Sequence, residues 1–343
     1  IAGVSFLIVR QENREINAYP NACLHRGRML KEFDGHASDI RCAFHGFAWT
    51  LDGCLKDVPA RWDFPQIKDD EWSLPEIPVA TWAGFIFINF DSNAGPLKEY
   101  LGVLPAHLDD FGIGDRYIET HLCKRLPVNW KAAEEAFMEA YHVKETHAGG
   151  REFSEPITTY DVFGDNVNRF IHTVGAANPR MPKPPTQQDL MQQLWGRRGP
   201  IEGECPRVPE GQTARDLYAR IIQAQLGEKY DQDFSDYSTA QTLDSIEYFL
   251  FPNLFIFPGL SLPMVYRFRP DPENPDFSYF DLFFLRPKHP DKAPPAPPEP
   301  LQLDIHDSYT QAEDLGFLGA VYDQDTDNMA AQTRGFKTCA KGG

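Results

Sequence analysis

Hydrophobic residues in the first hundred positions form short runs separated by turn residues. Runs rich in β-branched and aromatic residues, typical of strands, occupy residues 4–9, 16–19, 40–44 and 85–90. The pairs Asp34-Gly35 and Asp52-Gly53 mark turns between them. The pattern predicts a small all-β unit, followed by a connector at residues 96–105.

The rest of the chain mixes helical and strand patterns, which indicates an α+β region. Residues 129–147 contain many helix formers and neither Gly nor Pro, so they predict one helix that ends near Gly149. A second helical pattern, broken near residues 316–319, spans residues 306–334. Strands are predicted at residues 245–257, 264–268 and 281–285. Residues 175–240 are expected to be insertions over a site, and residues 288–300 an exposed Pro-rich loop.

One predicted strand has an aromatic face. Phenylalanines alternate within residues 245–257, at positions 249, 251, 255 and 257. Core packing explains most of them, and an apolar binding pocket is the functional alternative. Arg267 and Arg269 are either exposed strand residues or partners for a substrate carboxylate.

Composition and charge exclude several classes of protein. Hydrophobic residues make up 42% and charged residues 24%, as in ordinary globular proteins. The net charge of −17 argues against binding to nucleic acid or to an anionic membrane, both of which need a basic surface. No apolar run approaches the ~20 residues of a membrane-spanning helix. Six cysteines are too few for a disulfide scaffold, so a cytoplasmic enzyme is expected.

Both ends of the chain read as cut. The sequence does not begin with Met, and residues 3–10 resemble a strand already under way. The last residues stop without a recognisable boundary. We therefore expect the first domain to be truncated at its start and the second at its end.

Two short segments each pair a cysteine with a histidine. They are Cys23-Leu24-His25 and Cys42-Ala43-Phe44-His45, separated by sixteen residues. Two thiolates and two imidazoles are good metal ligands, and coincidence is improbable in a chain with six Cys and ten His. On ligand types alone, a structural zinc site and an iron–sulfur site both remain open.

A second set of candidate ligands lies in the predicted helix at residues 129–147. Glu139 and His142 are three residues apart and share a helix face. His142 and His147 are five residues apart, which turns them to different faces of an ideal helix. They reach one metal only if the helix ends or bulges between them; otherwise they are surface residues of an amphipathic helix.

The two Cys–His segments and the predicted helix at residues 129–147 together resemble a known family. Cys23-Leu24-His25-Arg26-Gly27 and Cys42-Ala43-Phe44-His45-Gly46 resemble the two cluster-binding loops of Rieske proteins. The sequence Asn129-Trp130-Lys131, followed by residues 135–142 and then His147, resembles the catalytic segment of Rieske non-haem iron aromatic-ring-hydroxylating oxygenases, in their large (α) subunit. The resemblance covers residues 4–336. It implies an N-terminal all-β Rieske [2Fe–2S] domain at residues 1–105 and a helix-grip (SRPBCC-like) catalytic domain at residues 106–343.

The resemblance also implies the site residues. It assigns Cys23, His25, Cys42 and His45 as ligands of a [2Fe–2S] cluster. It assigns His142, His147 and a distant aspartate as ligands of Fe(II). Asp325 fits the family position best, and Asp323 and Asp327 stay open as alternatives. Glu139 stands where many relatives carry an acid that links a cluster histidine of one subunit to an iron histidine of the next. That implies a homotrimer with Glu139 between His45 and His142.

The implied function is that of the terminal oxygenase of a multicomponent system. Electrons from NAD(P)H reach the cluster through a ferredoxin or a reductase and serve O2 activation at the iron. Hydroxylation, cis-dihydroxylation and demethylation of an apolar, aromatic substrate are all compatible. We find no G-x-G-x-x-G after a predicted strand, so the reductase is expected on a separate polypeptide. The substrate and the presence of a small β subunit stay open, and the competing classes are a non-catalytic Rieske electron carrier and a zinc-stabilised ligand-binding protein.

Overall fold

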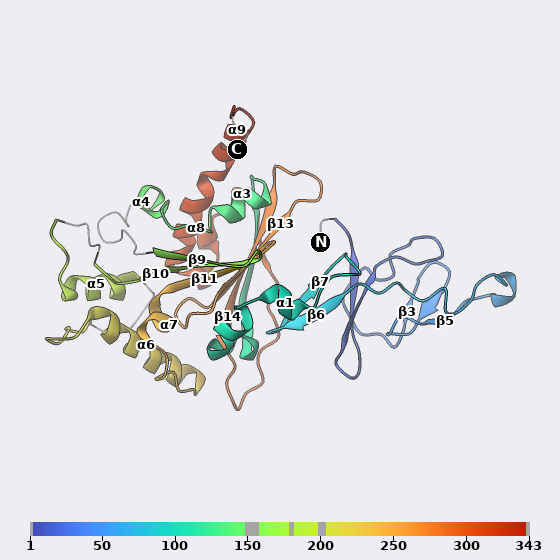
Figure 1. Cartoon of the computed structure of the whole chain (residues 1–343), viewed down its shortest axis with the longest axis horizontal. Helices are drawn as coiled ribbons and strands as arrows, with labels where there is room; N and C mark the ends of the chain where they lie inside the picture. Colours follow the sequence, from blue (N-terminus) through green and yellow to red (C-terminus); the bar gives the residue numbers. More distant parts are fainter. Residues whose placement is uncertain (1–2, 148–157, 178–181, 198–203, 341–343) are drawn as a thin grey trace. The chain divides into compact units, whose positions relative to one another are not determined.

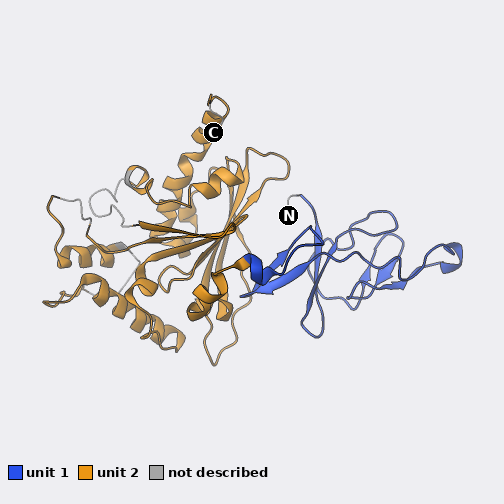
Figure 2. Cartoon of the chain, in the orientation of Figure 1, with its two compact units in different colours: residues 1–100 blue, residues 101–343 orange. Residues whose placement is uncertain are grey.

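The chain forms two compact units. A computed structural model describes residues 3–147, 158–177, 182–197 and 204–340 (Figure 1). Unit 1 comprises Ile1–Tyr100 and unit 2 comprises Leu101–Gly343 (Figure 2). The domain boundary expected after residue 105 lies slightly further along the chain than this division. Among the helices of the described ranges, none has the length and apolar character needed to cross a membrane.

Unit 1 is built from short antiparallel strands. β1 (Phe6–Arg10) pairs with β2 (Ile16–Pro20), β3 (Ile40–Arg41) and β5 (Leu55–Asp57) flank β4 (Ala48–Trp49), and β6 (Val79–Trp82) pairs with β7 (Phe85–Ile88). The fully buried Tyr19, Phe47 and Trp49 anchor its core. The predicted strand at 40–44 ends at Arg41, because Cys42 already begins a tight loop.

The predicted connector at residues 96–105 is instead helical. α1 (Leu97–Leu101) and α2 (Leu104–Leu108) follow each other directly, and two short 3₁₀ turns come next. Pro105 lies in the first turn of α2, where a backbone N–H has no helical partner to lose. Leu101, Leu104 and Leu108 are buried. Burial of this apolar face outweighs the preference of the nearby turn residues for a loop.

Unit 2 contains an eight-stranded sheet. Its strand order is β15-β8-β14-β13-β12-β11-β10-β9, antiparallel except for the parallel pair β15–β8. The strands are β8 (Arg116–Leu126), β9 (Thr158–Phe163), β10 (Val167–His172), β11 (Ser245–Leu250), β12 (Leu254–Phe257), β13 (Met264–Pro270), β14 (Ser278–Pro287) and β15 (Leu301–Leu303). The combination confirms the α+β class and the order of a small β domain followed by a domain with a large sheet.

Helices flank this sheet. They are α3 (Trp130–Glu135), α4 (Val143–Thr146), α5 (Gln187–Arg197), α6 (Ala214–Tyr230), α7 (Thr239–Leu243), α8 (Phe317–Asp327) and α9 (Met329–Phe336). Figure 1 shows α3, α4 and α8 on one side of the sheet, and α6 and α7 on the other. The polar stretch at residues 175–240 therefore contributes helices in its described parts.

The aromatic segment at residues 245–257 is a hairpin and not one strand. Phe249 of β11 pairs with Phe255 of β12, and both are buried. Phe251 lies in the turn between them and is 51% exposed. Pro252 has no N–H for a sheet ladder, which ends the first strand there.

The predicted helix at residues 129–147 is also interrupted. α3 begins after Asn129, whose side chain accepts a hydrogen bond from the Lys131 N–H, and it ends at Glu135. Phe137 then packs among the sheet aromatics, with ring centroids 5.5 Å from Phe268 and 5.4 Å from Phe280. Regular helix resumes only at Val143. This break precedes His142; the helix end that the metal interpretation requires between His142 and His147 comes at the end of α4, where His147 leaves helical geometry with φ of −102° and ψ of 88°.

Candidate metal centres

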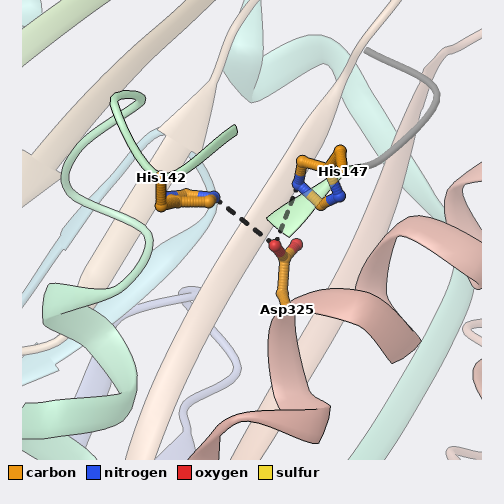
Figure 3. Close-up of side chains that lie close together, drawn as sticks. All are labelled: His142, His147 and Asp325. Carbon is orange, nitrogen blue, oxygen red and sulfur yellow. Dashed lines mark ion pairs between the residues drawn. The ribbon is translucent and has the colours of Figure 1, made fainter. Parts of the chain in front are cut away.

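Three predicted ligands converge in unit 2. The side chains of His142, His147 and Asp325 each offer a ligand atom, and these atoms all lie within 4.8 Å of one another (Figure 3). Nε2 of His147 is 3.0 Å from Asp325 Oδ1, and Nε2 of His142 is 3.4 Å from the same oxygen. That oxygen is buried and accepts no hydrogen bond from any described residue. Two imidazole nitrogens and an unsatisfied carboxylate oxygen around one point fit a divalent metal ion.

The local backbone explains how His142 and His147, five residues apart, reach the same point. His142 precedes α4 with helical backbone angles, and His147 follows α4 with non-helical angles, so the chain leaves the helical path at the second histidine. Asp325 belongs to α8, which lies on the same side of the sheet as α4 (Figure 1). The five-residue separation that disfavours a shared face in an ideal helix is therefore overcome by the end of α4 at His147.

Both histidines are held by acceptors on their other nitrogen. Glu139 Oε1 lies 2.7 Å from His142 Nδ1, and Glu139 Oε2 accepts the His142 backbone N–H at 3.0 Å. Gln324 Oε1 lies 2.8 Å from His147 Nδ1. Because an amide or carboxylate oxygen only accepts, each Nδ1 carries the proton and each Nε2 keeps a free lone pair. The sequence reasoning missed Gln324, although its position next to Asp325 was a usable signal.

Electrostatics in this group favour an ionised acid. Burial opposes ionisation of Asp325, but His142 and His147 outweigh it and lower the pKa of the carboxyl group. Burial likewise opposes protonation of His142, while Asp325 and Glu139 raise its pKa. For His147, Asp325 and Gln324 raise the pKa against the same burial. Each shift thus favours the charged form of its group, an anionic Asp325 beside protonated histidines, and a bound metal cation would take the place of those protons.

The alternative aspartates have other surroundings. Asp323 Oδ1 accepts the Tyr309 N–H at 3.0 Å, and its Oδ2 accepts the Ser308 hydroxyl at 2.5 Å. Asp323 therefore ties α8 to the turn at Ser308. Asp327 is exposed at the end of α8. Of the three acids, Asp325 is the one that the structure brings to the two histidines.

Replacing Gln324 by Ala is expected to weaken Fe(II) binding by about 10-fold, the lower end of the cost of losing a partner behind a metal ligand. Without Gln324, His147 loses the acceptor that orients its ring. Competition with a chelator measures the affinity. Asp327→Ala, on the same helix, is the control and should bind Fe(II) as the wild type does. Equal affinities in both variants would remove Gln324 from the site.

The two Cys–His segments of unit 1 fold into matching loops. The Gly27 N–H donates to Cys23 O at 2.8 Å, and the Gly46 N–H donates to Cys42 O at 3.0 Å. Each cysteine N–H donates in turn to the residue five positions on, at 2.8 Å in both loops. Gly27 and Gly46 have φ of 69° and 81°, a region that favours glycine. Both loops therefore present a cysteine and a histidine from the same backbone turn.

The surroundings of these loops fit a polynuclear cluster. Cys23 and Cys42 are buried, and the His25 and His45 ring centroids lie 4.7 Å apart. His25 Nδ1 is buried and has no hydrogen-bond partner among the described residues. Burial opposes ionisation of Cys42, yet the N–H groups of Phe44 and His45 lower the pKa of its thiol. Such N–H groups aimed at sulfur stabilise the negative charge of an iron–sulfur centre.

A single zinc ion fits these loops less well. In a tetrahedral zinc site all four ligand atoms lie close to one ion. Within the described ranges, the ligand atoms of the His142 group lie within 4.8 Å of one another, and no three ligand atoms of the two loops come that close together. A cluster with two iron atoms, each bound by one pair of ligands, does not require all four ligand atoms around one point.

Known families match both units. The model of the ring hydroxylating alpha subunit (catalytic domain) matches residues 111–341, and the Rieske [2Fe–2S] domain model matches residues 1–68. Over 177 residues the chain is 30% identical to the carnitine monooxygenase oxygenase subunit of Escherichia coli, a match over 51% of this chain and 44% of the relative. Over 152 residues it is 34% identical to biphenyl 2,3-dioxygenase subunit alpha of Rhodococcus jostii, over 42% of this chain and 33% of the relative. The chain thus spans less than half the length of these curated relatives.

Solved structures share the fold. A quaternary ammonium Rieske monooxygenase in complex with L-carnitine superposes with a TM-score of 0.62 at 17% identity, over 98% of this chain and 72% of that one. Naphthalene 1,2-dioxygenase with indole bound gives a TM-score of 0.62 at 19% identity, over 99% of this chain and 71% of that one. With one family model over most of unit 2 and a second over the loops of unit 1, the chain belongs to the ring-hydroxylating oxygenase α-subunit family, whose members carry a Rieske [2Fe–2S] cluster and a mononuclear iron.

Proposed function

We propose that this chain is the terminal oxygenase component of a multicomponent Rieske oxygenase system. The observation that carries the proposal is the convergence of His142, His147 and Asp325 on one unsatisfied oxygen, in a chain that also folds two matching Cys–His loops. An electron carrier needs only the loops. A second centre with three protein ligands and space for other ligands is what oxygenase chemistry adds.

The proposal assigns two sets of ligands. Cys23, His25, Cys42 and His45 hold the [2Fe–2S] cluster, and His142, His147 and Asp325 hold Fe(II). When bound, the cluster supplies electrons and the iron supplies the site for O2. Glu139 and Gln324 keep the two iron histidines in the tautomer that binds metal.

Electron delivery is proposed to involve other polypeptides and a second copy of this chain. A ferredoxin, an NAD(P)H-dependent reductase, or both would reduce the cluster. Glu139 already contacts His142 through Nδ1. In a homotrimer the same carboxylate would also contact His45 of a neighbouring subunit, which gives a short route between the two centres.

The substrate is proposed to bind on the side of the sheet that carries the iron ligands. Phe137, Phe257, Tyr266 and Tyr322 line the buried core there, so much of the contact surface is apolar and aromatic. Relatives named for carnitine and for biphenyl differ widely in substrate. Hydroxylation, dihydroxylation and oxidative demethylation all remain compatible with the ligand set.

Metal analysis of the purified protein tests the proposal. An oxygenase should contain about three iron atoms and about two acid-labile sulfides per chain and absorb visible light. Cys42→Ser should lose the visible spectrum, while Cys54→Ser, an exposed cysteine outside the loops, should keep it. Only about two iron atoms per chain would favour an electron carrier, and colourless protein with zinc would favour a ligand-binding protein.

A further inference from the structure

A buried asparagine lies next to the first Cys–His loop and is not one of its proposed ligands. Asn21 follows β2 directly, two residues before Cys23, and is 7% exposed. A side-chain amide offers two acceptor positions on its oxygen and two donor hydrogens on its nitrogen. Burial of these groups without partners is costly, so the contacts of the amide indicate what Asn21 does in the fold.

All four positions of the Asn21 amide are used. Its Oδ1 accepts the backbone N–H groups of Leu30 and Lys31, both at 3.0 Å. Its Nδ2 donates to Lys31 O at 2.7 Å and to the Ser5 hydroxyl at 3.1 Å. The two N–H donors require the amide oxygen and the carbonyl requires the NH2 group, so one orientation of the amide satisfies every partner. An aspartate at this position would lack the donor, and a leucine would lack both groups.

These contacts join the residues that follow the first loop to the residue that precedes it. Inside the loop the Cys23 N–H donates to Arg28 O, and Leu30 and Lys31 come two and three residues later. Leu30 is 2% exposed and belongs to the core of unit 1. Without Asn21 the N–H of this buried residue would lose its partner, which costs more than the loss of an exposed hydrogen bond.

The second loop is supported in another way. Cys42 directly follows β3, and Phe47, whose carbonyl accepts the Cys42 N–H at 2.8 Å, directly precedes β4. The two strands pair with each other in antiparallel register, so this loop is the turn of a hairpin. The described structure has no strand between β2 and β3. The first loop therefore has no hairpin of its own to hold it.

Ring contacts hold the first loop at its histidine. The His25 ring stacks on the buried Phe47, with centroids 4.7 Å apart and planes at 19°. Phe64 meets the same ring edge-on, with centroids 6.0 Å apart. The loop is thus fixed by ring contacts in its middle and by Asn21 at its two ends. Cys23 and His25 lie on the segment that these contacts enclose.

We propose that Asn21 is the positioning residue of the first cluster loop. Its amide holds residues 30–31 against the end of β2 and keeps Cys23 and His25 in the arrangement that binds the [2Fe–2S] cluster. Asn21 does for this loop what strand pairing does for the second. The inference rests on the proposed function, because the cluster is the group for which the loop is held. A loop that is fixed in advance loses little conformational freedom when it binds.

Cluster loss from the holoprotein tests the proposal. Asn21→Ala removes the whole amide, so the first loop should open more often. It should release the cluster to a chelator about 10-fold faster, the effect of one buried backbone group left without a partner. The decay of visible absorbance measures the rate. The control is Asn17→Ala on β2, whose amide contacts Gln11 and Glu76, and it should release the cluster at the wild-type rate. A wild-type rate in Asn21→Ala would overturn the proposal.

Hydrogen exchange, measured by mass spectrometry, separates this role from a general contribution to stability. In Asn21→Ala, exchange should accelerate about 10-fold in residues 21–31 and stay at the wild-type rate in residues 42–49. Equal acceleration in both segments would make Asn21 an ordinary core residue and overturn the proposal. Wild type decides the matter even if the variant fails to fold. The Leu30 and Lys31 amides should be protected there, and unprotected amides would refute the contact on which the proposal depends.

The electron paramagnetic resonance spectrum of the reduced cluster depends on the geometry of its ligands. Its lines should broaden in Asn21→Ala, because Cys23 and His25 then sample more positions. Lines identical to those of wild type would limit Asn21 to a role in stability and overturn the positioning role. Metal and sulfide are determined on the same samples. Zinc in place of the cluster would refute the oxygenase, while the exchange rates at Leu30 and Lys31 would still decide whether Asn21 holds the loop, so the two failures are distinguishable.

Discussion

Replacing His142 or His147 by Ala is expected to abolish oxygenation and leave the visible spectrum of the cluster intact. Each variant loses one of the three proposed protein ligands of the iron, and the proposed cluster ligands are in the other compact unit. Iron content should fall from about three to about two atoms per chain. Product formation should fall by about 1,000-fold or more, since the metal supplies several kcal/mol of the rate enhancement.

The aspartate variants supply the matched comparison for this experiment. Asp325→Ala should lose the mononuclear iron as the histidine variants do. Asp327→Ala should retain it, because that side chain is exposed at the end of α8. Asp323→Ala removes acceptors for Ser308 and Tyr309, so its expected effect is on stability rather than on iron. Loss of the cluster spectrum in the histidine variants would break the two-centre interpretation.

Glu139→Gln is expected to retain both metals and slow electron transfer between them. The carboxamide is nearly isosteric, so the fold should persist. It loses the negative charge that stabilises the proton on His142 Nδ1, at the 2.7 Å contact. Reduction of the cluster by its partner should stay normal, while substrate-dependent reoxidation of the cluster should slow by about 10- to 100-fold. Stopped-flow absorbance of the cluster measures both steps.

The control is Glu135→Gln, at an exposed position on α3. It should reoxidise at the wild-type rate. Wild-type reoxidation in a Glu139→Gln protein with full iron would rule out the bridging role. Loss of iron would instead make Glu139 a ligand or a group required to form the iron site. The trimer itself is tested by the size of the holoprotein in solution.

Local sequence was sufficient for the loops of unit 1. Each loop is closed by hydrogen bonds between residues four or five apart, and each needs a glycine with positive φ at its fourth step. The residues that set the backbone geometry of the Cys23 and Cys42 loops therefore lie within five positions of each cysteine. The order of a β domain followed by an α+β domain was also predicted from the sequence. Its signals, the alternation of hydrophobic residues and the turn residues, depend only on neighbouring positions.

Where packing competed with local preference, the sequence reading was wrong. Residues 129–147 have strong helix propensity, yet burial of Phe137 in the sheet core accompanies a break that lasts to His142. Residues 245–257 alternate as one strand would, yet Pro252 and the pairing of Phe249 with Phe255 make a hairpin. In both cases long-range contacts outweigh propensities of a fraction of a kcal/mol per residue.

The sequence by itself determined the family, the two histidine-bearing motifs and the short list of acids for the third ligand. Only the tertiary structure selected Asp325 from that list, since α8 alone decides which of its side chains faces His142 and His147. It also revealed Gln324 behind His147. Gln324 lies 177 positions from His147 along the chain, and no local pattern encodes a contact of that range.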